Sequence, residues 1–358
     1  MCWVIGQFLA SGVLKGVSGM TGPLGYKIPY ALQWVWPVPL IIGIYLAPES
    51  PWWLVRSGRI EEAKEQLLRL TSPKQTDFNP DETISMMVYT TEFEKKHTEH
   101  TRYLDCFKGV NLRRTETVCM VWAIQTLCGA SSIFGFSTYF FLQAGLNDSS
   151  AFSLTLGVYA LGAAGTMLSW FLLGWFGRRS LYLWGQIVMC AVLLAIGFAD
   201  FANTSASLWA IATLVMVCTF VYDATIGPVC YSLVAELPST RLRNKTVVLA
   251  RNCFNITGIL GNVLTTQMLN PGAWNWGAKT ALFWGGSCAL CAVWTYFRLP
   301  EPNGRTFVEM DLLFESGTSA RRFASTDVSD VAAGQASVSG EYASDEKSPK
   351  VVQVEHIA

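Results

Sequence analysis

The sequence predicts an all-α membrane protein with about eight transmembrane helices. Hydrophobic residues make up 51% of the 358 residues and charged residues only 15%, whereas soluble domains carry about 25% charged residues. The charges crowd between long apolar runs and are almost absent from them. Water cannot satisfy backbone groups inside a bilayer, so these runs are expected to be helices.

Eight apolar runs approach the length that a membrane helix needs, which is about 20 residues. The expected spans are 1–20, 30–48, 117–143, 151–176, 181–200, 207–234, 246–268 and 280–298. The first run has no basic leader and contains Gln7, Ser11 and Lys15. A membrane helix is therefore favoured there over a signal peptide.

Several classes of function find no support in the composition. The 26 basic and 26 acidic residues cancel, and nothing points to a nucleic-acid partner. His97 and His100 have a spacing that permits a metal site, but a solvated helix face is the favoured interpretation. There is no nucleophile elbow, P-loop or zinc signature, so neither an enzyme, a catalytic residue nor a cofactor is expected.

The distribution of basic residues predicts the orientation of the spans. The stretch 56–115 holds eleven Lys and Arg, whereas 144–150 and 201–206 hold none. The connections after even-numbered spans are therefore expected in the cytoplasm, with both termini on that side. The expected organisation is two spans over 1–48, a cytoplasmic helical linker over 49–115, a six-helix bundle over 116–315 and a disordered tail over 316–358.

Polar residues inside the spans mark candidate functional positions, because they are costly there. Span seven carries Asn252, Asn255, Asn262 and Thr266 within about 80° of helix circumference. Hydrogen bonding between helices, at about 0.6 kcal/mol per contact, explains any one of these residues equally well. Three asparagines on one stripe favour a polar pathway.

Gln125 in span three and Gln7 in span one are further amide candidates. Gln125 shares a helix face with Cys128 and Gly129, and Trp122 lies close by in the sequence. Amides suit the hydroxyl groups of a sugar, and flat aromatic rings suit its C–H face. The alternative is tight helix packing through small residues.

Asp223 lies in the apolar context VMVCTFVYDATIGP of span six. A carboxylate at a helix centre costs about 2.5–3.5 kcal/mol on insertion scales. It is interpreted either as a proton site or as a partner for backbone amides freed near Gly227 and Pro228. The sequence supports both readings equally.

Short motifs at the expected cytoplasmic helix ends resemble those of the sugar porter branch of the major facilitator superfamily. They are PESPWWL at 48–54, GRR at 177–179, GP at 227–228, VAELPSTR at 234–241 and PEPNGRT at 300–306. The stretch KIPYALQWVWPVPLIIGIYLAPESPWWLV resembles fungal maltose and α-glucoside permeases in particular. The resemblance covers nearly all of residues 1–315.

The motifs place acidic and basic residues together at the cytoplasmic edge, where they are expected to form a gate that latches the two halves of the transporter. The gate residues are Glu49, Arg178, Arg179, Glu236, Arg241, Glu301 and Arg305. Anchoring by the arginines alone is the simpler alternative. It leaves the repeated nearby glutamates unexplained.

The resemblance also implies a substrate site. Family members place glutamine ahead of a glycine in the seventh helix, which matches Gln125 here, with Thr126 in the place of a second glutamine. The other implied positions are Gln7, Tyr231 and Asn255, and Asp223 matches an acidic residue before the Gly-Pro pair.

The family has twelve helices, and this sequence resembles it from the fifth helix onward, so the fold is expected to lack the first four helices. The implied activity is movement of a sugar, an α-glucoside such as maltose, with proton symport, in the cell membrane. The chain alone is expected to be inactive. The alternative is a non-transporting sugar sensor, a regulatory fragment or an inactive remnant.

Overall fold

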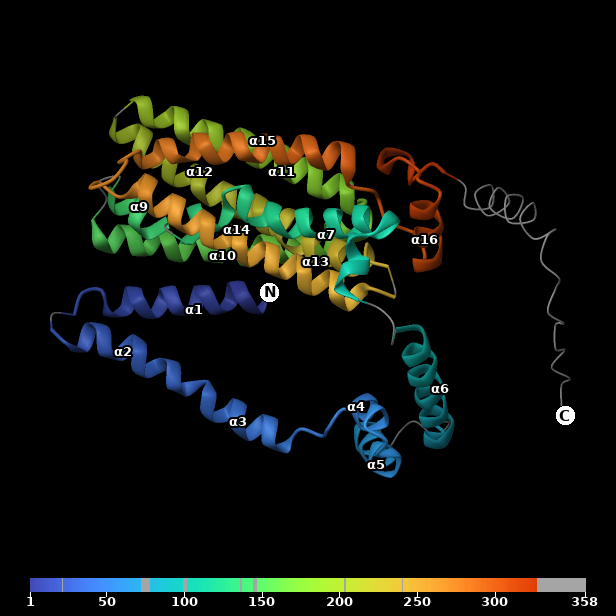
Figure 1. Cartoon of the computed structure of the whole chain (residues 1–358). Helices are drawn as coiled ribbons and strands as arrows, with labels where there is room; N and C mark the ends of the chain where they lie inside the picture. Colours follow the sequence, from blue (N-terminus) through green and yellow to red (C-terminus); the bar gives the residue numbers. More distant parts are fainter. Residues whose placement is uncertain are drawn as a thin grey trace, which may run out of the picture.

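A computed structural model describes residues 1–20, 22–71, 78–98, 102–135, 137–143, 147–202, 204–239 and 241–326. Every regular element within these ranges is a helix, as the apolar runs predict. Figure 1 shows one large bundle with smaller helical segments at its side and at one end.

The bundle consists of the helices that follow the polar linker. They are α7 (Gly109–Leu127), α8 (Ala130–Gly135), α9 (Ser137–Gln143), α10 (Asp148–Trp175), α11 (Arg178–Ala199), α12 (Ser205–Ala224), α13 (Ile226–Glu236), α14 (Arg243–Leu269) and α15 (Thr280–Arg298). Helix α11 packs along α15 and α12, α10 packs along α12, and α14 packs along α7 (Figure 1). Large apolar side chains also cover the outside, among them Trp175 at 80% exposure and Leu290 at 74%. An apolar exterior of this kind suits contact with lipid.

Two of the expected spans are broken helices. Helix α7 stops before Gly129, whose positive φ of +80° and close approach to Trp284 leave no room for a side chain. The sixth expected span is divided at Thr225, between α12 and α13. Broken membrane helices expose backbone groups at depth, and such groups need partners inside the protein.

The first two expected spans differ from each other in their packing. Helix α1 (Cys2–Val17) lies along α10. The segment α2 (Leu24–Leu32), η1 (Gln33–Val35) and α3 (Pro37–Leu46) has no buried residue and turns away from the bundle (Figure 1).

Six helical stretches among the described residues are long and apolar enough to span a membrane, against eight expected. They are Leu24–Leu46, Ser149–Trp175, Arg178–Ala202, Ala206–Glu236, Arg243–Leu269 and Gly277–Arg298. The two remaining expected spans, the first and the third, are not single helices of spanning length. Helix α1 has only 16 residues, and the third span is divided into α7, α8 and α9.

The polar linker forms a small helical unit of its own. Helices α4 (Pro51–Arg56), α5 (Ile60–Leu70) and α6 (Pro80–Thr98) share a core that includes Leu54 and Ile84. A salt bridge of 2.5 Å joins Lys64 on α5 to Asp81 on α6. The turn η2 (Tyr103–Phe107) then leads into α7.

The segment after α15 docks against the end of the bundle. It contains α16 (Phe307–Glu315) and η5 (Ala320–Arg322). Phe314 and Phe323 are buried and meet edge to face at 5.0 Å. The expected disordered tail began at residue 316, but packing continues through this turn, and residues 327–358 lie outside the described part.

Candidate functional site

Gln125 connects the two helix breaks. It lies in the last turn of α7, is 4% exposed, and its Nε2 donates to the Gly227 carbonyl at 3.3 Å. Gly227 lies two residues beyond Thr225, where α12 gives way to α13. The bond therefore ties the end of α7 to the first turn of α13, beside the interruption of the sixth span.

Thr126 faces a different neighbour. It is 1% exposed, and its methyl group lies so close to Gly261 on α14 that a Cβ there would sit 2.9 Å away. Its hydroxyl has no hydrogen-bond partner among the described residues. Gln125 and Thr126 thus lie in adjoining contacts of α7 with α13 and α14.

Aromatic rings from three helices gather near Gln125. Trp122 of α7 meets Tyr231 of α13 edge to face at 5.1 Å and Phe254 of α14 at 5.2 Å. The Arg251 guanidinium lies 4.8 Å from the Trp122 ring centre and 4.6 Å from that of Phe254. Sequence reasoning missed Arg251, although a cation inside an apolar run was a usable signal.

The side chains of Tyr231 and Asn255 are exposed at the surface of the described bundle. Tyr231 is 58% exposed, and Asn255 is exposed one residue beyond Phe254. Asn252, Asn262 and Thr266 are exposed as well, so the polar stripe of α14 lies at the surface of the bundle.

Gln7 lies apart from this cluster. It is half-buried on α1, the helix that packs along α10. Within the described residues it forms no hydrogen bond with Gln125 or Asn255. The structure therefore brings Gln125, Thr126 and Tyr231 together around α7, with Asn255 beside them, and leaves Gln7 on another helix pair.

Asp223 lies in the last turn of α12, where α12 meets α10 and α1. A Cβ at Gly162 of α10 would sit 2.5 Å from Asp223 Oδ2 and 3.4 Å from a methyl group of Val4 on α1. Oδ1 lies on the side of Gly227, 3.7 Å from a Cβ placed there. The carboxylate is half-buried beside the helix break, a position compatible with either reading given by the sequence.

Charged residues of the sequence motifs meet at the end of the bundle where α16 docks. Arg178 Nη2 lies 3.4 Å from Glu236 Oε1, and Nη1 of the same side chain bonds the Asn303 amide oxygen. Glu301 Oε2 accepts from the backbone N–H of Arg179 at 3.0 Å. Three motifs that are distant in sequence thus form one connected cluster.

The remaining motif residues have other partners. Arg179 donates to the Tyr296 carbonyl at 2.8 Å, and Arg305 donates to the Thr326 carbonyl at 2.7 Å. Arg241 is exposed. Glu49 is exposed beside α4 and α5, where the pKa of Arg59 is raised by its hydrogen bond with Glu62 and, less, by the Glu49 charge.

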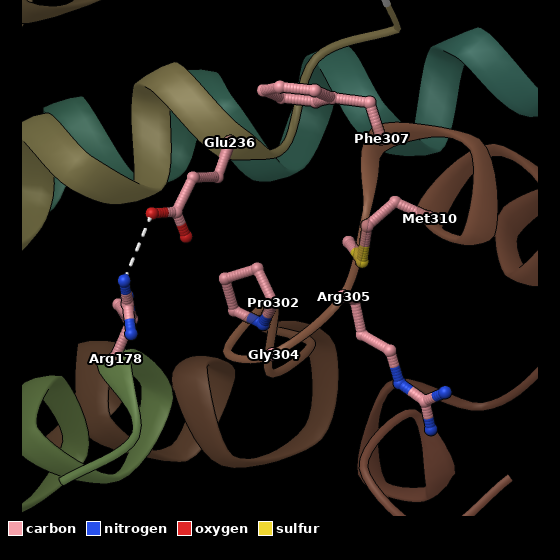
Figure 2. Close-up of a pocket in the computed structure, with 7 residues that line it drawn as sticks. All are labelled: Arg178, Glu236, Pro302, Gly304, Arg305, Phe307 and Met310. Carbon is pink, nitrogen blue, oxygen red and sulfur yellow. Dashed lines mark hydrogen bonds and ion pairs between the residues drawn. The ribbon is translucent and has the colours of Figure 1, made fainter. Parts of the chain in front are cut away.

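A cavity of about 220 Å³ opens at this cluster (Figure 2). Its lining residues are Arg178, Glu236, Pro302, Gly304, Arg305, Phe307 and Met310. Figure 2 shows the Arg178–Glu236 pair along one side of the cavity and the Arg305 guanidinium pointing away from it.

No metal site is formed by the described residues, since none of their His, Cys, Asp and Glu side chains gather in threes. Of the two histidines with metal-site spacing, His100 and the side chain of His97 lie outside the described part.

Comparison with known proteins agrees with this architecture. A family model described as "Sugar (and other) transporter" matches residues 1–314. The chain therefore belongs to this family of membrane transporters and is a multi-pass membrane protein.

Its relatives include fungal permeases. The chain is 45% identical over 331 residues to the general alpha-glucoside permease of Saccharomyces cerevisiae, a match that covers 91% of this chain and 54% of the relative. It is 42% identical over 341 residues to maltose permease MAL61 of the same species, covering 94% and 55%. The chain thus spans about half the length of the curated relatives it matches.

Solved structures show the fold to be that of the major facilitator superfamily. The proton:xylose symporter XylE bound to 6-bromo-6-deoxy-D-glucose aligns with a TM-score of 0.67 at 19% identity, covering 87% of this chain and 65% of that one. The inward open form of XylE from E. coli aligns with a TM-score of 0.66 at 17% identity, covering 87% and 63%.

Proposed function

We propose that this chain takes part in moving a sugar, an α-glucoside such as maltose, across the cell membrane by alternating access. The observation that carries the proposal is the relation to the α-glucoside and maltose permeases at 42–45% identity. The chain's role is transport and not catalysis.

Substrate contacts are proposed for Gln7, Gln125, Thr126, Tyr231 and Asn255. The 58% exposed ring of Tyr231 offers a flat apolar surface for the C–H face of a pyranose, and the exposed Asn255 amide offers both donors and an acceptor for its hydroxyls. The Gly227 bond uses one donor of the Gln125 amide and leaves its other groups for substrate.

Coupling to protons is proposed for Asp223. Its carboxylate lies at the junction of α10, α12 and α1 beside the break in the sixth span. Taking up or losing a proton there changes the charge between helices that must move against each other.

The cytoplasmic gate is proposed at the Arg178–Glu236 pair together with Glu301 and Arg179. These contacts join the α11, α13 and post-α15 ends of one bundle. We place this cluster and both termini in the cytoplasm on the evidence of the basic residues at 56–115.

The experiment uses cells that lack their own α-glucoside permeases. Two proteins are compared: residues 1–358 alone, and a fusion protein in which the part of MAL61 that this chain does not match precedes Met1. The fusion protein is expected to give saturable uptake of labelled maltose. Residues 1–358 alone are expected at background, because α2 and α3 bury no residue in the described part.

Background uptake by a fusion protein that reaches the cell surface would contradict the proposed function. Maltose binding without uptake would instead favour a sensor.

A further inference from the structure

Two tryptophans lie side by side in the loop between α14 and α15. Trp274 is 50% exposed and Trp276 is 41% exposed. Their ring centres are 5.4 Å apart, with 36° between the ring planes. The loop lies at the end of α14 that is opposite to the Arg178–Glu236 pair (Figure 1).

The backbone of this loop is fixed by hydrogen bonds to the end of α14. Trp274 N donates to the Gln267 carbonyl at 3.1 Å, and Trp276 N donates to the Met268 carbonyl at 2.7 Å. The N–H groups of neighbouring loop residues are also bonded: Ala273 and Asn275 donate to the Asn270 carbonyl, and Gly272 donates to the Asn270 side chain. The backbone that carries the two rings is therefore ordered before any ligand arrives, which lowers the entropy cost of binding.

Asn275 lies between the two tryptophans in the sequence. It is the one non-glycine residue of the described chain with a positive φ, at 51°. Asparagine tolerates this left-handed conformation better than most residues. The Trp274 and Trp276 rings flank this residue and lie next to each other.

Amide side chains occur in the same short segment as the rings. Gln267, Asn270 and Asn275 are all exposed, and Asn270 uses its side-chain oxygen for the Gly272 N–H. Flat aromatic rings and exposed amides in one loop match a pyranose ring, whose C–H face is apolar and whose hydroxyls both donate and accept hydrogen bonds.

The position of the loop connects it to the candidate pathway. The turn η4 (Gly277–Lys279) that follows Trp276 packs against α9 (Figure 1). Helix α9 continues, beyond the break at Gly129, the same span that carries Gln125 and Trp122. The loop thus lies at the far end of the third expected span, whose α7 part carries the proposed contacts Gln125 and Thr126.

We propose that Trp274 and Trp276 form an outer docking platform for one pyranose ring of an α-glucoside. The platform rests on the proposed function and adds to it a first, separate contact for the sugar before it reaches Gln125 and Tyr231.

The test compares variants that change ring shape but keep apolar bulk. In the fusion protein, the double variant Trp274→Leu/Trp276→Leu is expected to raise the KM for labelled maltose about 3- to 10-fold, the range for loss of aromatic contacts. The maximal rate should stay near that of the parent. Trp274→Phe/Trp276→Phe keeps flat rings and should recover most of the lost affinity.

Trp209→Leu is the matched control, because Trp209 is 55% exposed in the first turns of α12 and belongs to no ring pair within the described residues. An unchanged KM in the double leucine variant would overturn the platform. Lower expression or stability with an unchanged KM would also overturn it, since that is the behaviour of a membrane-interface anchor.

A second measurement does not depend on transport. Saturation-transfer NMR with maltose and purified residues 1–358 in nanodiscs should show equal transfer from the parent chain and from Trp209→Leu, and weaker transfer from the double leucine variant, which keeps the proposed contacts at Gln125, Tyr231 and Asn255. Equal transfer from all three would overturn the platform. Absence of uptake by the parent fusion protein contradicts the proposed function, and the NMR result then decides the platform alone.

Discussion

The side-chain amide of Gln125 donates a hydrogen bond to the backbone carbonyl of Gly227, at 3.3 Å from Nε2 to the oxygen. This bond crosses from α7 to α13 and joins the regions where two membrane spans are interrupted. It makes Gln125 a structural tie in this conformation as well as a candidate for substrate contact.

Gln125→Leu is expected to destabilise the purified chain by about 0.5–1.5 kcal/mol, because it removes a buried side-chain hydrogen bond between α7 and α13. Thermal unfolding in nanodiscs measures the effect. Thr126→Val is the control on the next residue: its hydroxyl has no partner, so its loss should be neutral or stabilising. Equal stability of Gln125→Leu and the parent would mean that the tie contributes nothing.

The close approach of α10 and α12 depends on glycine at position 165. A Cβ there would lie 2.7 Å from the Phe220 carbonyl oxygen and 3.2 Å from the Ala224 nitrogen, both backbone atoms that cannot move aside easily. Gly165→Ala should therefore cost about 1–3 kcal/mol of stability. Gly174→Ala on the same helix meets nothing within 4 Å and should be tolerated. Similar melting temperatures for the two variants would refute this packing.

Arg114 fastens the segment after α15 to the bundle. It is 3% exposed, donates to the Met310 carbonyl at 2.9 Å, forms an ion pair with Asp311 and lies over the Phe314 ring at 4.4 Å. Arg114→Leu removes the hydrogen bond to Met310 and the ion pair with the half-buried Asp311, at a cost of about 1–3 kcal/mol. The expected result is faster tryptic cleavage after Arg321 and Arg322.

The control for this experiment is Arg298→Gln. Arg298 pairs with Glu116 at the surface, where the side chains are 46% and 36% exposed, and such pairs contribute about 0–1 kcal/mol. Its cleavage pattern should match that of the parent. Slow cleavage in Arg114→Leu would show that the apolar contacts of Phe314 and Phe323 hold the segment unaided.

Asp223→Asn separates the two interpretations of the half-buried Asp223 carboxylate. If Asp223 carries the coupled proton, the variant fusion protein should lose uptake driven by a pH gradient and keep maltose exchange. If Asp223 only supports the helix break, the same change should mainly lower expression. Normal expression together with normal pH-driven uptake would exclude both roles.

The sequence predicted the helical class and most of the bundle, because long apolar runs between charged loops have few other stable structures in lipid. It did not predict the break after Leu127, since Cys128 and Gly129 sit inside an unbroken apolar run. That break depends on Trp284, which lies more than 150 positions away.

The site was predictable by residue type but not by partner. Gln125 was predictable as a site residue because an amide inside a membrane span is costly. Its partner is a backbone carbonyl on another helix, and no spacing rule in the sequence predicts that contact. Phe323 lies in the segment 316–358, whose low apolar content predicts disorder. Its burial depends on Phe314 and on Arg113, whose guanidinium lies 5.7 Å from its ring centre.

Reconstitution of the fusion protein is the most direct test of α-glucoside transport. The purified fusion protein is placed in sealed liposomes, and labelled maltose is followed with and without an inward proton gradient. Uptake is expected to be saturable. Under the gradient, labelled maltose should accumulate inside the liposomes above equilibrium, and an uncoupler should abolish that accumulation. Maltose entry no faster than into protein-free liposomes, under either condition, would contradict the proposed transport.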